Sequence, residues 1–239
     1  MQRHVFVTGG TGYLGRPLIE HLAARGHHVR ALVREGSTAK LPGVAEPVIG
    51  NALDATGWTS SVAPADTLVH LVGTPHPSPF KGAAFRAVDL PSIRASVAAA
   101  VGAKVSHFVY VSVAHPAPIM RDYIAVRTEG EALIAAQGLN VTILRPWYVL
   151  GPGHWWPYAL VPFYAVARRI PSLRDDAMRL DLVTHEQMLT ALVAAVENPA
   201  IGVRVVGVDE ISSTPNLQLS THKAPGSKNR SEIAASDRD

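Results

Sequence analysis

The chain contains no cysteine among its 239 residues. This absence excludes disulfide bonds, thiolate metal sites and a cysteine nucleophile. The sequence also lacks any apolar run close to the roughly 18 residues that a bilayer-spanning helix needs. Its first residues, Met1 to His4, show no signal-peptide pattern. We therefore expect no membrane segment and a cytoplasmic protein.

Charged residues are few, at 17% of the chain, and the formal net charge is only +3. Lysine and arginine are scattered and form no basic run with interleaved aromatics, which disfavours nucleic-acid binding. No His, Asp and Glu residues have the spacing of a zinc or iron site, so no metal is expected. The remaining class is an ordinary globular domain, in keeping with a hydrophobic fraction of 47%.

Short valine-rich runs alternate with helical patterns along most of the chain. Six apolar runs predict buried strands, at residues 4–7, 29–33, 67–72, 107–112, 141–144 and 203–208. Their nearly continuous hydrophobicity is typical of parallel strands that are covered on both faces. Leu14, Leu18 and Leu22 mark a first helix, and a capping-box spacing from Thr184 to Gln187 opens a later one. The alternation predicts an α/β fold with a doubly wound parallel sheet, the Rossmann fold.

Two segments depart from this alternation. Residues 151–182 contain four prolines and several aromatic residues, which indicates a small irregular C-terminal cap on the substrate side. Residues 211–239 are dominated by polar residues and proline, with too few apolar side chains to offset the entropy of ordering. We expect a single domain over residues 1–210 that includes the cap, followed by a disordered tail over 211–239.

The most specific motif is Thr8-Gly9-Gly10-Thr11-Gly12-Tyr13-Leu14-Gly15, which follows the first predicted strand and opens the first helix. Glycines allow close backbone approach there, and a helix N-terminus offers amide groups to a pyrophosphate. A glycine-rich turn without a ligand is the alternative, but the order of strand, loop and helix favours dinucleotide binding. The expected contacts are Gly9, Thr11, Gly12, Tyr13, Leu14 and Gly15.

The second predicted strand ends with Arg34, at the place about 20 residues past the glycines where the nucleotide is distinguished. An acidic residue there binds the ribose 2′-hydroxyl of NAD, whereas a guanidinium matches the 2′-phosphate of NADP. Arg34 therefore favours NADP(H). In the other interpretation Arg34 is a solvated charge and Glu35 binds the ribose.

From about residue 3 to residue 210 the chain resembles the short-chain dehydrogenase/reductase superfamily. The resemblance is to its extended or atypical branch, which includes epimerase/dehydratase-like and NmrA-like proteins. Gly50-Asn51-Ala52-Leu53-Asp54 is similar to the family's GDxxD segment, which implies that Asn51 and the backbone at Ala52 touch adenine. The resemblance likewise places Gly73 beside the adenine ribose, and the backbone after Pro146 near the nicotinamide.

The resemblance also implies catalytic residues. Ser112 ends a predicted strand, Tyr123 begins a predicted helix, and Arg127 stands where the family has lysine. In the family, the tyrosine exchanges a proton with a carbonyl or alcohol, the serine holds the substrate oxygen, and the cation favours the ionised phenol and binds the nicotinamide ribose. The i, i+4 spacing puts Tyr123 and Arg127 on one helix face, but arginine cannot relay a proton by deprotonating. In the alternative, Tyr123 only packs at the helix start and Arg127 pairs with Glu131 or solvent.

Aromatic residues follow on the substrate side. Trp147, Tyr148 and Trp155 are candidates to line an apolar cleft, with His154 as an auxiliary acid or base. The other interpretation makes the aromatics core or subunit contacts and His154 an ordinary loop histidine. Two hypotheses stay open: an NADP(H)-dependent oxidoreductase or epimerase-type enzyme acting on a carbonyl or alcohol of a small apolar molecule, or a non-catalytic NADP(H)-binding sensor or assembly protein of the NmrA-like kind.

Overall fold

The structure, a computed structural model, describes residues 1–151, 169–170, 175 and 177–215. Its main feature is a seven-stranded parallel sheet with the order β3-β2-β1-β4-β5-β6-β9. The strands are β1 (His4–Thr8), β2 (His28–Val33), β3 (Glu46–Ile49), β4 (Thr67–His70), β5 (His107–Val111), β6 (Val141–Leu144) and β9 (Val203–Val206). The chain runs outward from β1 to β3 and then returns to β4 on the other side of β1. This reversal is the doubly wound topology that the sequence predicts.

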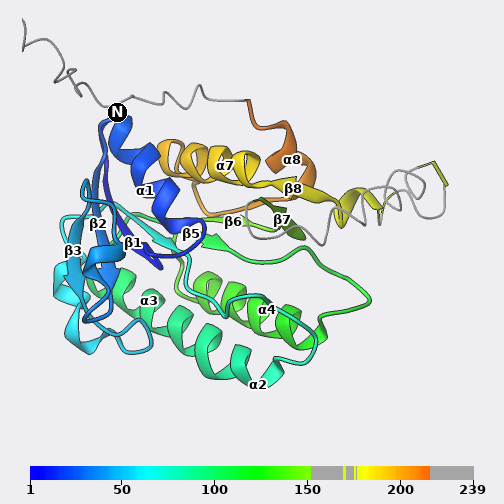
Figure 1. The fold of residues 1–239 in the computed structure, drawn as a ribbon, viewed down its shortest axis with the longest axis horizontal. Coiled ribbons are helices and arrows are strands. Elements are labelled where there is room, and N and C mark those ends of the chain that lie inside the picture. The colour runs from blue at the N-terminus through cyan, green and yellow to red at the C-terminus, as the bar shows by residue number, and fades with distance from the viewer. Residues whose placement is uncertain (152–168, 171–174, 176, 216–239) are drawn as a thin grey trace, which may run out of the picture.

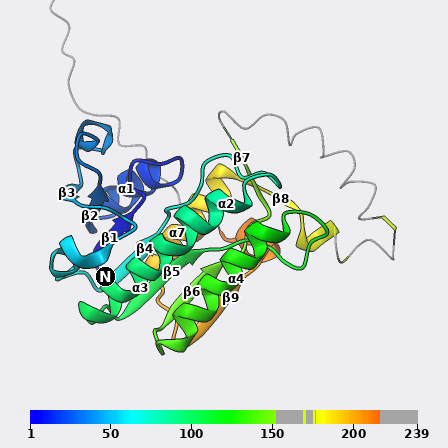
Figure 2. The same cartoon turned by 90° about the horizontal axis from the view of Figure 1, so that it is seen from below.

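Helices cover both faces of the sheet (Figures 1 and 2). On one face lie α1 (Gly15–Ala24) and α7 (His185–Glu197), and on the other lie α3 (Leu90–Gly102) and α4 (Arg121–Ala136). Two clusters of buried apolar side chains fill the spaces between sheet and helices. Short helical turns complete this part of the chain: α2 (Gly82–Ala84), a π-helical turn (Phe85–Asp89), and 3-10 turns at Thr38–Lys40, Ala55–Gly57 and Thr59–Ser61.

The start of α7 confirms the predicted capping box. The Thr184 hydroxyl accepts a hydrogen bond from the Gln187 amide at 3.1 Å. The Gln187 side-chain oxygen in return accepts one from the Thr184 amide at 2.7 Å. These reciprocal bonds satisfy two amides that the first helical turn leaves without partners.

Three short strands were not predicted. In β3 (Glu46–Ile49) only Val48 is buried and Pro47 interrupts the apolar pattern. The strand lies at the edge of the sheet, where the missing proline amide is tolerated. The other two, β7 (Tyr148–Leu150) and β8 (Leu182–Thr184), pair in parallel as a separate sheet. They flank the segment expected to form the substrate cap, most of which lies outside the described residues.

The described chain continues in ordered form past the expected start of the tail. Helix α8 (Val208–Ser213) packs against α7, and Ile211 is fully buried. The expected start of the tail at residue 211 is therefore too early, because Val208 and Ile211 are both buried and anchor a helix whose other residues are polar. Residues 216–239 lie outside the described part. Among the described residues, no helix combines the length and apolar character that a membrane span requires.

Candidate cofactor and substrate site

A cavity of about 360 Å³ opens at the carboxyl ends of β1, β4, β5 and β6. It lies where the strand order reverses, which is the usual ligand site of a doubly wound sheet. Twelve of the residues predicted from the sequence line it: Gly9, Gly12, Tyr13, Leu14, Gly15, Gly73, Ser112, Tyr123, Arg127, Pro146, Trp147 and Tyr148. Residues that are far apart in the sequence are thus brought to one place.

The glycine loop between β1 and α1 is tightly built. Gly9 has a φ of +79°, and a Cβ atom there would lie 2.7 Å from the carbonyl carbon of Leu71. A Cβ atom on Gly15 would overlap the carbonyl oxygen of Gly9. Helix α1 begins without a side-chain cap and without an acidic residue in its first turn. The helix dipole at this end therefore fits an anionic group such as a pyrophosphate.

Tyr13 links this loop to α7. Its ring centre lies 4.4 Å from that of His185, and the His185 Nε2 atom lies 3.1 Å from the Tyr13 carbonyl oxygen. The Tyr13 side chain also lies against Gly151, where an added Cβ atom would overlap the phenol oxygen. Contacts from Gly151, directly after β7, and from α7 therefore hold the loop.

Four predicted nucleotide contacts lie outside the cavity lining. They are Thr11, Arg34, Asn51 and Ala52. Arg34 and the adjacent Glu35 are both exposed directly after β2. The Asn51 side chain accepts a hydrogen bond from the Leu53 amide at 3.0 Å and so holds the turn after β3. Since β1, β2 and β3 are parallel, these residues follow the same edge of the sheet at which the cavity opens.

Tyr123 lies in the first turn of α4, half-buried at the cavity wall. Its ring centre is 4.9 Å from that of Phe85 and 5.0 Å from the Cζ atom of Arg127. The predicted i, i+4 neighbourhood is therefore present, with the guanidinium over the face of the phenol.

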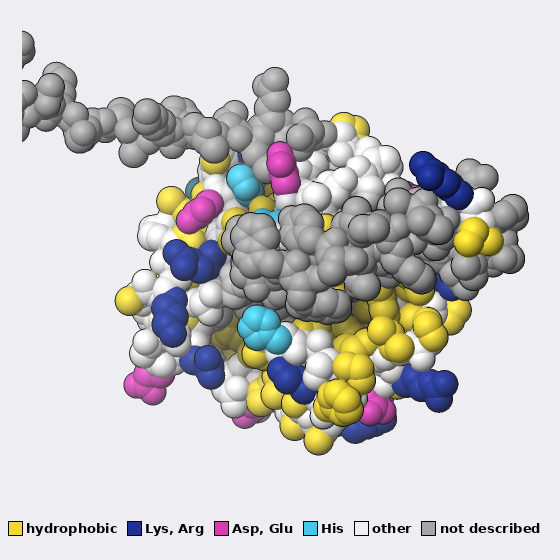
Figure 3. Space-filling view, turned by 45° about the vertical axis from the view of Figure 1, so that its right-hand side comes forward, with side chains coloured by type: hydrophobic (Ala, Val, Ile, Leu, Met, Phe, Trp, Pro, Cys, Tyr) yellow, Lys and Arg dark blue, Asp and Glu magenta, His cyan; other side chains and the backbone are white. Residues whose placement is uncertain are grey.

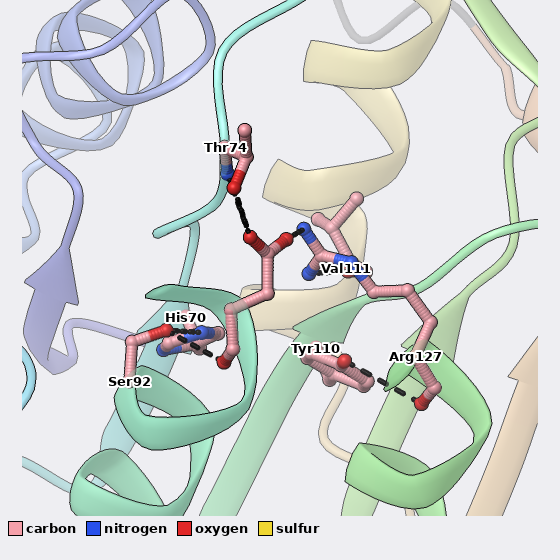
Figure 4. A network of polar contacts seen from close by, with 7 residues as sticks. His70, Thr74, Ser92, Tyr110, Val111 and Arg127 are labelled. Carbon is pink, nitrogen blue, oxygen red and sulfur yellow. Dashed lines mark hydrogen bonds and ion pairs between the residues drawn. The ribbon is translucent and has the colours of Figure 1, made fainter. Parts of the chain in front are cut away.

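The guanidinium of Arg127 is held by acceptors that the sequence did not suggest. Figure 4 shows Thr74, Val111 and Arg127 converging on this network. Arg127 donates from Nη2 to Asp89 at 2.7 Å and from Nη1 to the Val111 carbonyl at 3.0 Å. Asp89 also accepts hydrogen bonds from the Thr74 amide and hydroxyl, at 2.9 and 2.5 Å. Arg127 and Asp89 are only 6% and 2% exposed, so this is a buried ion pair.

The network keeps the Arg127 guanidinium positively charged. Burial disfavours that charge, but Tyr123, Tyr110 and Asp89 outweigh burial and hold the pKa of Arg127 above its ordinary value. Gly73 makes room for the guanidinium, because a Cβ atom there would lie 2.5 Å from Nη2. The alternative in which Arg127 pairs with Glu131 or solvent is therefore wrong.

Glu131 has different partners. The Ser112 hydroxyl donates a hydrogen bond to its Oε1 atom at 2.5 Å. Arg145 donates from Nε to the same oxygen at 2.9 Å, and from Nη2 to Oε2. The His115 Nε2 atom lies 3.9 Å away. Ser112 and Glu131 are 2% and 8% exposed, whereas the Arg145 side chain is 26% exposed. A second, partly buried ion pair therefore adjoins the serine.

Sequence reasoning named Glu131 only as a possible partner of Arg127, and it missed Asp89. Glu131 follows Arg127 by one helical turn, so the spacing from Tyr123 could have placed it on the same face of α4. Asp89 comes from the π-helical turn before α3, and its approach to Arg127 depends on packing between distant segments. His154 and Trp155 lie outside the described residues, and the described part contains no group of acidic residues and histidines able to hold a metal.

On the face shown in Figure 3, the Lys and Arg side chains of the described residues lie at several separate places, and a few of them are neighbours at its left side. Lysine and arginine side chains are dispersed among hydrophobic and neutral ones in that view. This agrees with the scattered distribution of these residues along the sequence.

Known proteins resemble this chain in sequence and in fold. A family model described as NAD(P)H-binding matches residues 9–152. The chain is 27% identical over 201 residues to a ceramide reductase of Caulobacter vibrioides, which covers 83% of this chain and 62% of that protein. It is 31% identical over 175 residues to a Stigmatella aurantiaca ketoreductase, which covers 61% of this chain and 50% of that protein. The latter is named for 4-hydroxy-2-methyl-3-oxo-4-farnesyl-3,4-dihydroquinoline-1-oxide.

Solved structures share the fold. The Bordetella bronchiseptica enzyme WbmH, in complex with NAD+, superposes with a TM-score of 0.63 at 20% identity. The match covers 85% of this chain and 75% of that one. The chain spans 62% and 50% of the lengths of the two reductases, so it matches only part of each.

Proposed function

Because the chain belongs to the NAD(P)H-binding family, we propose that it is an NADP(H)-dependent oxidoreductase acting on a carbonyl or alcohol of a small, largely apolar molecule. One observation carries the proposal. Ser112, Tyr123 and the cation of Arg127 line the same cavity as the glycine loop. A hydride-transfer site needs a bound cofactor and a proton donor at one substrate oxygen, and this cavity offers residues for both.

We propose reduction as the direction of the reaction. A bound NADPH would supply the hydride, and the glycine loop residues Gly9, Gly12 and Gly15 would hold it. The Tyr123 hydroxyl is the O–H donor at the cavity wall and would give the proton to the carbonyl oxygen. The names of the two similar proteins, a ceramide reductase and a ketoreductase, support the same direction.

We propose the position of the substrate in the cavity from its aromatic residues. Trp147 and Tyr148 line the cavity after β6 and give it an apolar wall. His154 and Trp155 stay predictions from the sequence. The ketoreductase substrate, by its name, carries a 3-oxo and a 4-hydroxy group on neighbouring positions. An oxygenated ketone on an apolar skeleton is therefore the substrate type that we propose.

NADP(H) is proposed over NAD(H) on the position of Arg34 after β2. A guanidinium that binds the 2′-phosphate adds a charge-assisted hydrogen bond, of about 1.5–3 kcal/mol, or roughly 10- to 150-fold in affinity. Titration should therefore give at least a tenfold lower Kd for NADPH than for NADH. Arg34→Ala should remove the difference, while Arg16→Ala, an exposed arginine in the first turn of α1, serves as the matched control. Equal affinities in the wild type would refute the preference.

A second candidate function, a non-catalytic NADP(H) sensor or assembly protein, is favoured by Arg127 alone. The family's lysine binds the nicotinamide ribose, whereas here both terminal nitrogens of the guanidinium are engaged by Asp89 and Val111. A substrate screen with NADPH separates the two functions. Turnover of a carbonyl compound supports the enzyme. Tight NADPH binding without turnover, together with recovery of a defined protein partner, supports the sensor.

A further inference from the structure

Two loops beside the cavity carry exposed apolar side chains. The first loop continues from Pro77, which lines the cavity, and carries Phe80, which is 96% exposed. The second continues from Val113, which also lines the cavity, and carries Ile119, which is 55% exposed. An exposed proline directly precedes each of the two side chains. Water is an unfavourable surrounding for apolar area of this size, so both loops offer surface that a partner could cover.

The two loops lie next to each other. One leads into α2 and the other into α4, and Figures 1 and 2 show both helices starting at the same end of the molecule. A Cβ atom on Gly82 would overlap the carboxylate of Asp122, so the two chain segments touch there. This contact lies two residues after Phe80 and three residues after Ile119. The two side chains and the prolines before them therefore form one surface, which we call the apolar rim.

Positive charge accompanies the apolar rim. Segments 79–86 and 118–122 contain three cations, Lys81, Arg86 and Arg121, and a single acid, Asp122. Both arginines are exposed, and within the described part of the chain neither forms an ion pair. Lys81 donates to a backbone carbonyl at 2.8 Å, which leaves its charge uncompensated. In Figure 3, which brings the right-hand end of Figure 1 forward, hydrophobic side chains gather in the lower right part of the view, with Lys and Arg side chains beside them.

We propose that the apolar rim docks on an anionic lipid surface. Apolar side chains on loops enter the headgroup region of a bilayer, and cations beside them are attracted to anionic lipids. A protein partner fits less well, because Phe80 can bury at most about 250 Å², whereas a standard protein interface takes roughly 800 Å² from each partner. Docking would place the cavity next to apolar molecules dissolved in the bilayer. This route of substrate entry rests on the proposed function, but the docking itself does not.

Vesicle flotation tests the docking without any substrate. The wild type should bind vesicles of phosphatidylglycerol and phosphatidylcholine in equal parts more tightly than vesicles of phosphatidylcholine alone. Phe80→Ser together with Ile119→Ser should lower the affinity for the anionic vesicles by about tenfold or more, because two apolar side chains no longer enter the bilayer. Arg86→Gln together with Arg121→Gln should lower it by about fivefold per cation.

The matched control is Ile201→Ser. Ile201 is 98% exposed and precedes β9, so it lies at the amino ends of the parallel strands, opposite the cavity. This substitution removes an equally exposed apolar side chain and should leave the affinity for anionic vesicles unchanged. All substituted side chains are exposed, so each variant should keep the unfolding temperature of the wild type.

The outcomes separate the docking from the proposed function. Equal binding to both kinds of vesicle, or anionic binding that survives the loss of Phe80 and Ile119, overturns the docking. A wild-type dimer that the same double variant loses in size-exclusion chromatography also overturns it, because a second copy of the chain would then cover the apolar rim. Reduction of a water-soluble ketone without vesicle binding overturns the docking and leaves the reductase standing. Vesicle binding by a protein that reduces no ketone supports the docking and counts against the reductase.

Discussion

At the scale of single residues, one buried and one partly buried ion pair lie along one face of α4. Tyr123, Arg127 and Glu131 follow one another at four-residue intervals, so they face the ends of β4 and β5 together. Asp89 holds Arg127, and Arg145 holds Glu131. The arginine in the lysine position is therefore accompanied by an acidic partner that anchors its guanidinium.

Asp89→Asn should destabilise the protein strongly. The carboxylate accepts two hydrogen bonds from Thr74 and one from Arg127, whereas asparagine has one acceptor oxygen and leaves the buried guanidinium without a counter-charge. Breaking a buried pair in this way costs about 3–5 kcal/mol of unfolding free energy. Urea denaturation measures the loss.

The matched control for Asp89→Asn is Glu129→Gln. Glu129 pairs with Arg94 at 2.8 Å, but the two side chains are 40% and 56% exposed. Removal of such a surface pair should cost less than about 1 kcal/mol. Similar losses in the two variants would show that the Asp89 pair is not the buried anchor described above.

At the scale of elements, the sequence predicted the helices, strands and turns that depend only on residues close to one another along the chain. Apolar runs predicted the strands on either side of the site. The spacing of glycines predicted the loop after β1, and the capping-box spacing predicted the start of α7. The edge strand β3 escaped because Pro47 and three exposed residues break its apolar pattern. The partners Asp89 and Arg145 escaped because 38 and 14 residues separate them from Arg127 and Glu131, so only the packed fold shows their contacts.

Thr184→Ala should weaken α7 through its N-terminus. Thr184 is exposed, so the substitution removes the capping hydrogen bond to Gln187 without opening a buried cavity. The expected loss of unfolding free energy is about 1 kcal/mol. Thr38→Ala is the control, because this exposed threonine has no side-chain hydrogen bond within the described part of the chain. A loss for Thr38→Ala equal to that for Thr184→Ala would contradict the capping role.

At the scale of the whole molecule, neutral histidines in the core couple stability to pH. Burial lowers the pKa of His70 to about 3, with a further contribution from Arg127, and burial also lowers the pKa of His107 to about 4. Both side chains are fully buried, with His107 3.0 Å from the Thr142 hydroxyl. The unfolded chain takes up these protons near pH 6.5, whereas the folded chain does not.

The sign of the effect follows from this difference. Below pH 6.5 the unfolded state binds more protons, so the unfolding free energy falls as the pH is lowered toward 4. Each buried histidine contributes a slope of up to about 1.4 kcal/mol per pH unit. His107 lies away from the cavity. Compared with His4→Gln, a substitution of an exposed histidine, His107→Gln should reduce the slope of the unfolding free energy against pH between pH 6 and 4 by the contribution of about one proton. Parallel profiles for the two variants would contradict the assignment of His107 as a neutral core residue.

The central claim is that this cavity reduces a carbonyl with Tyr123 as the proton donor. The most direct test is the single-turnover rate of hydride transfer from pre-bound NADPH, in wild type and Tyr123→Phe, with the NADPH Kd measured alongside. The account predicts a fall of at least about 100-fold in the rate, as for the loss of a general acid, with an unchanged Kd. An equal rate in the two proteins would contradict it.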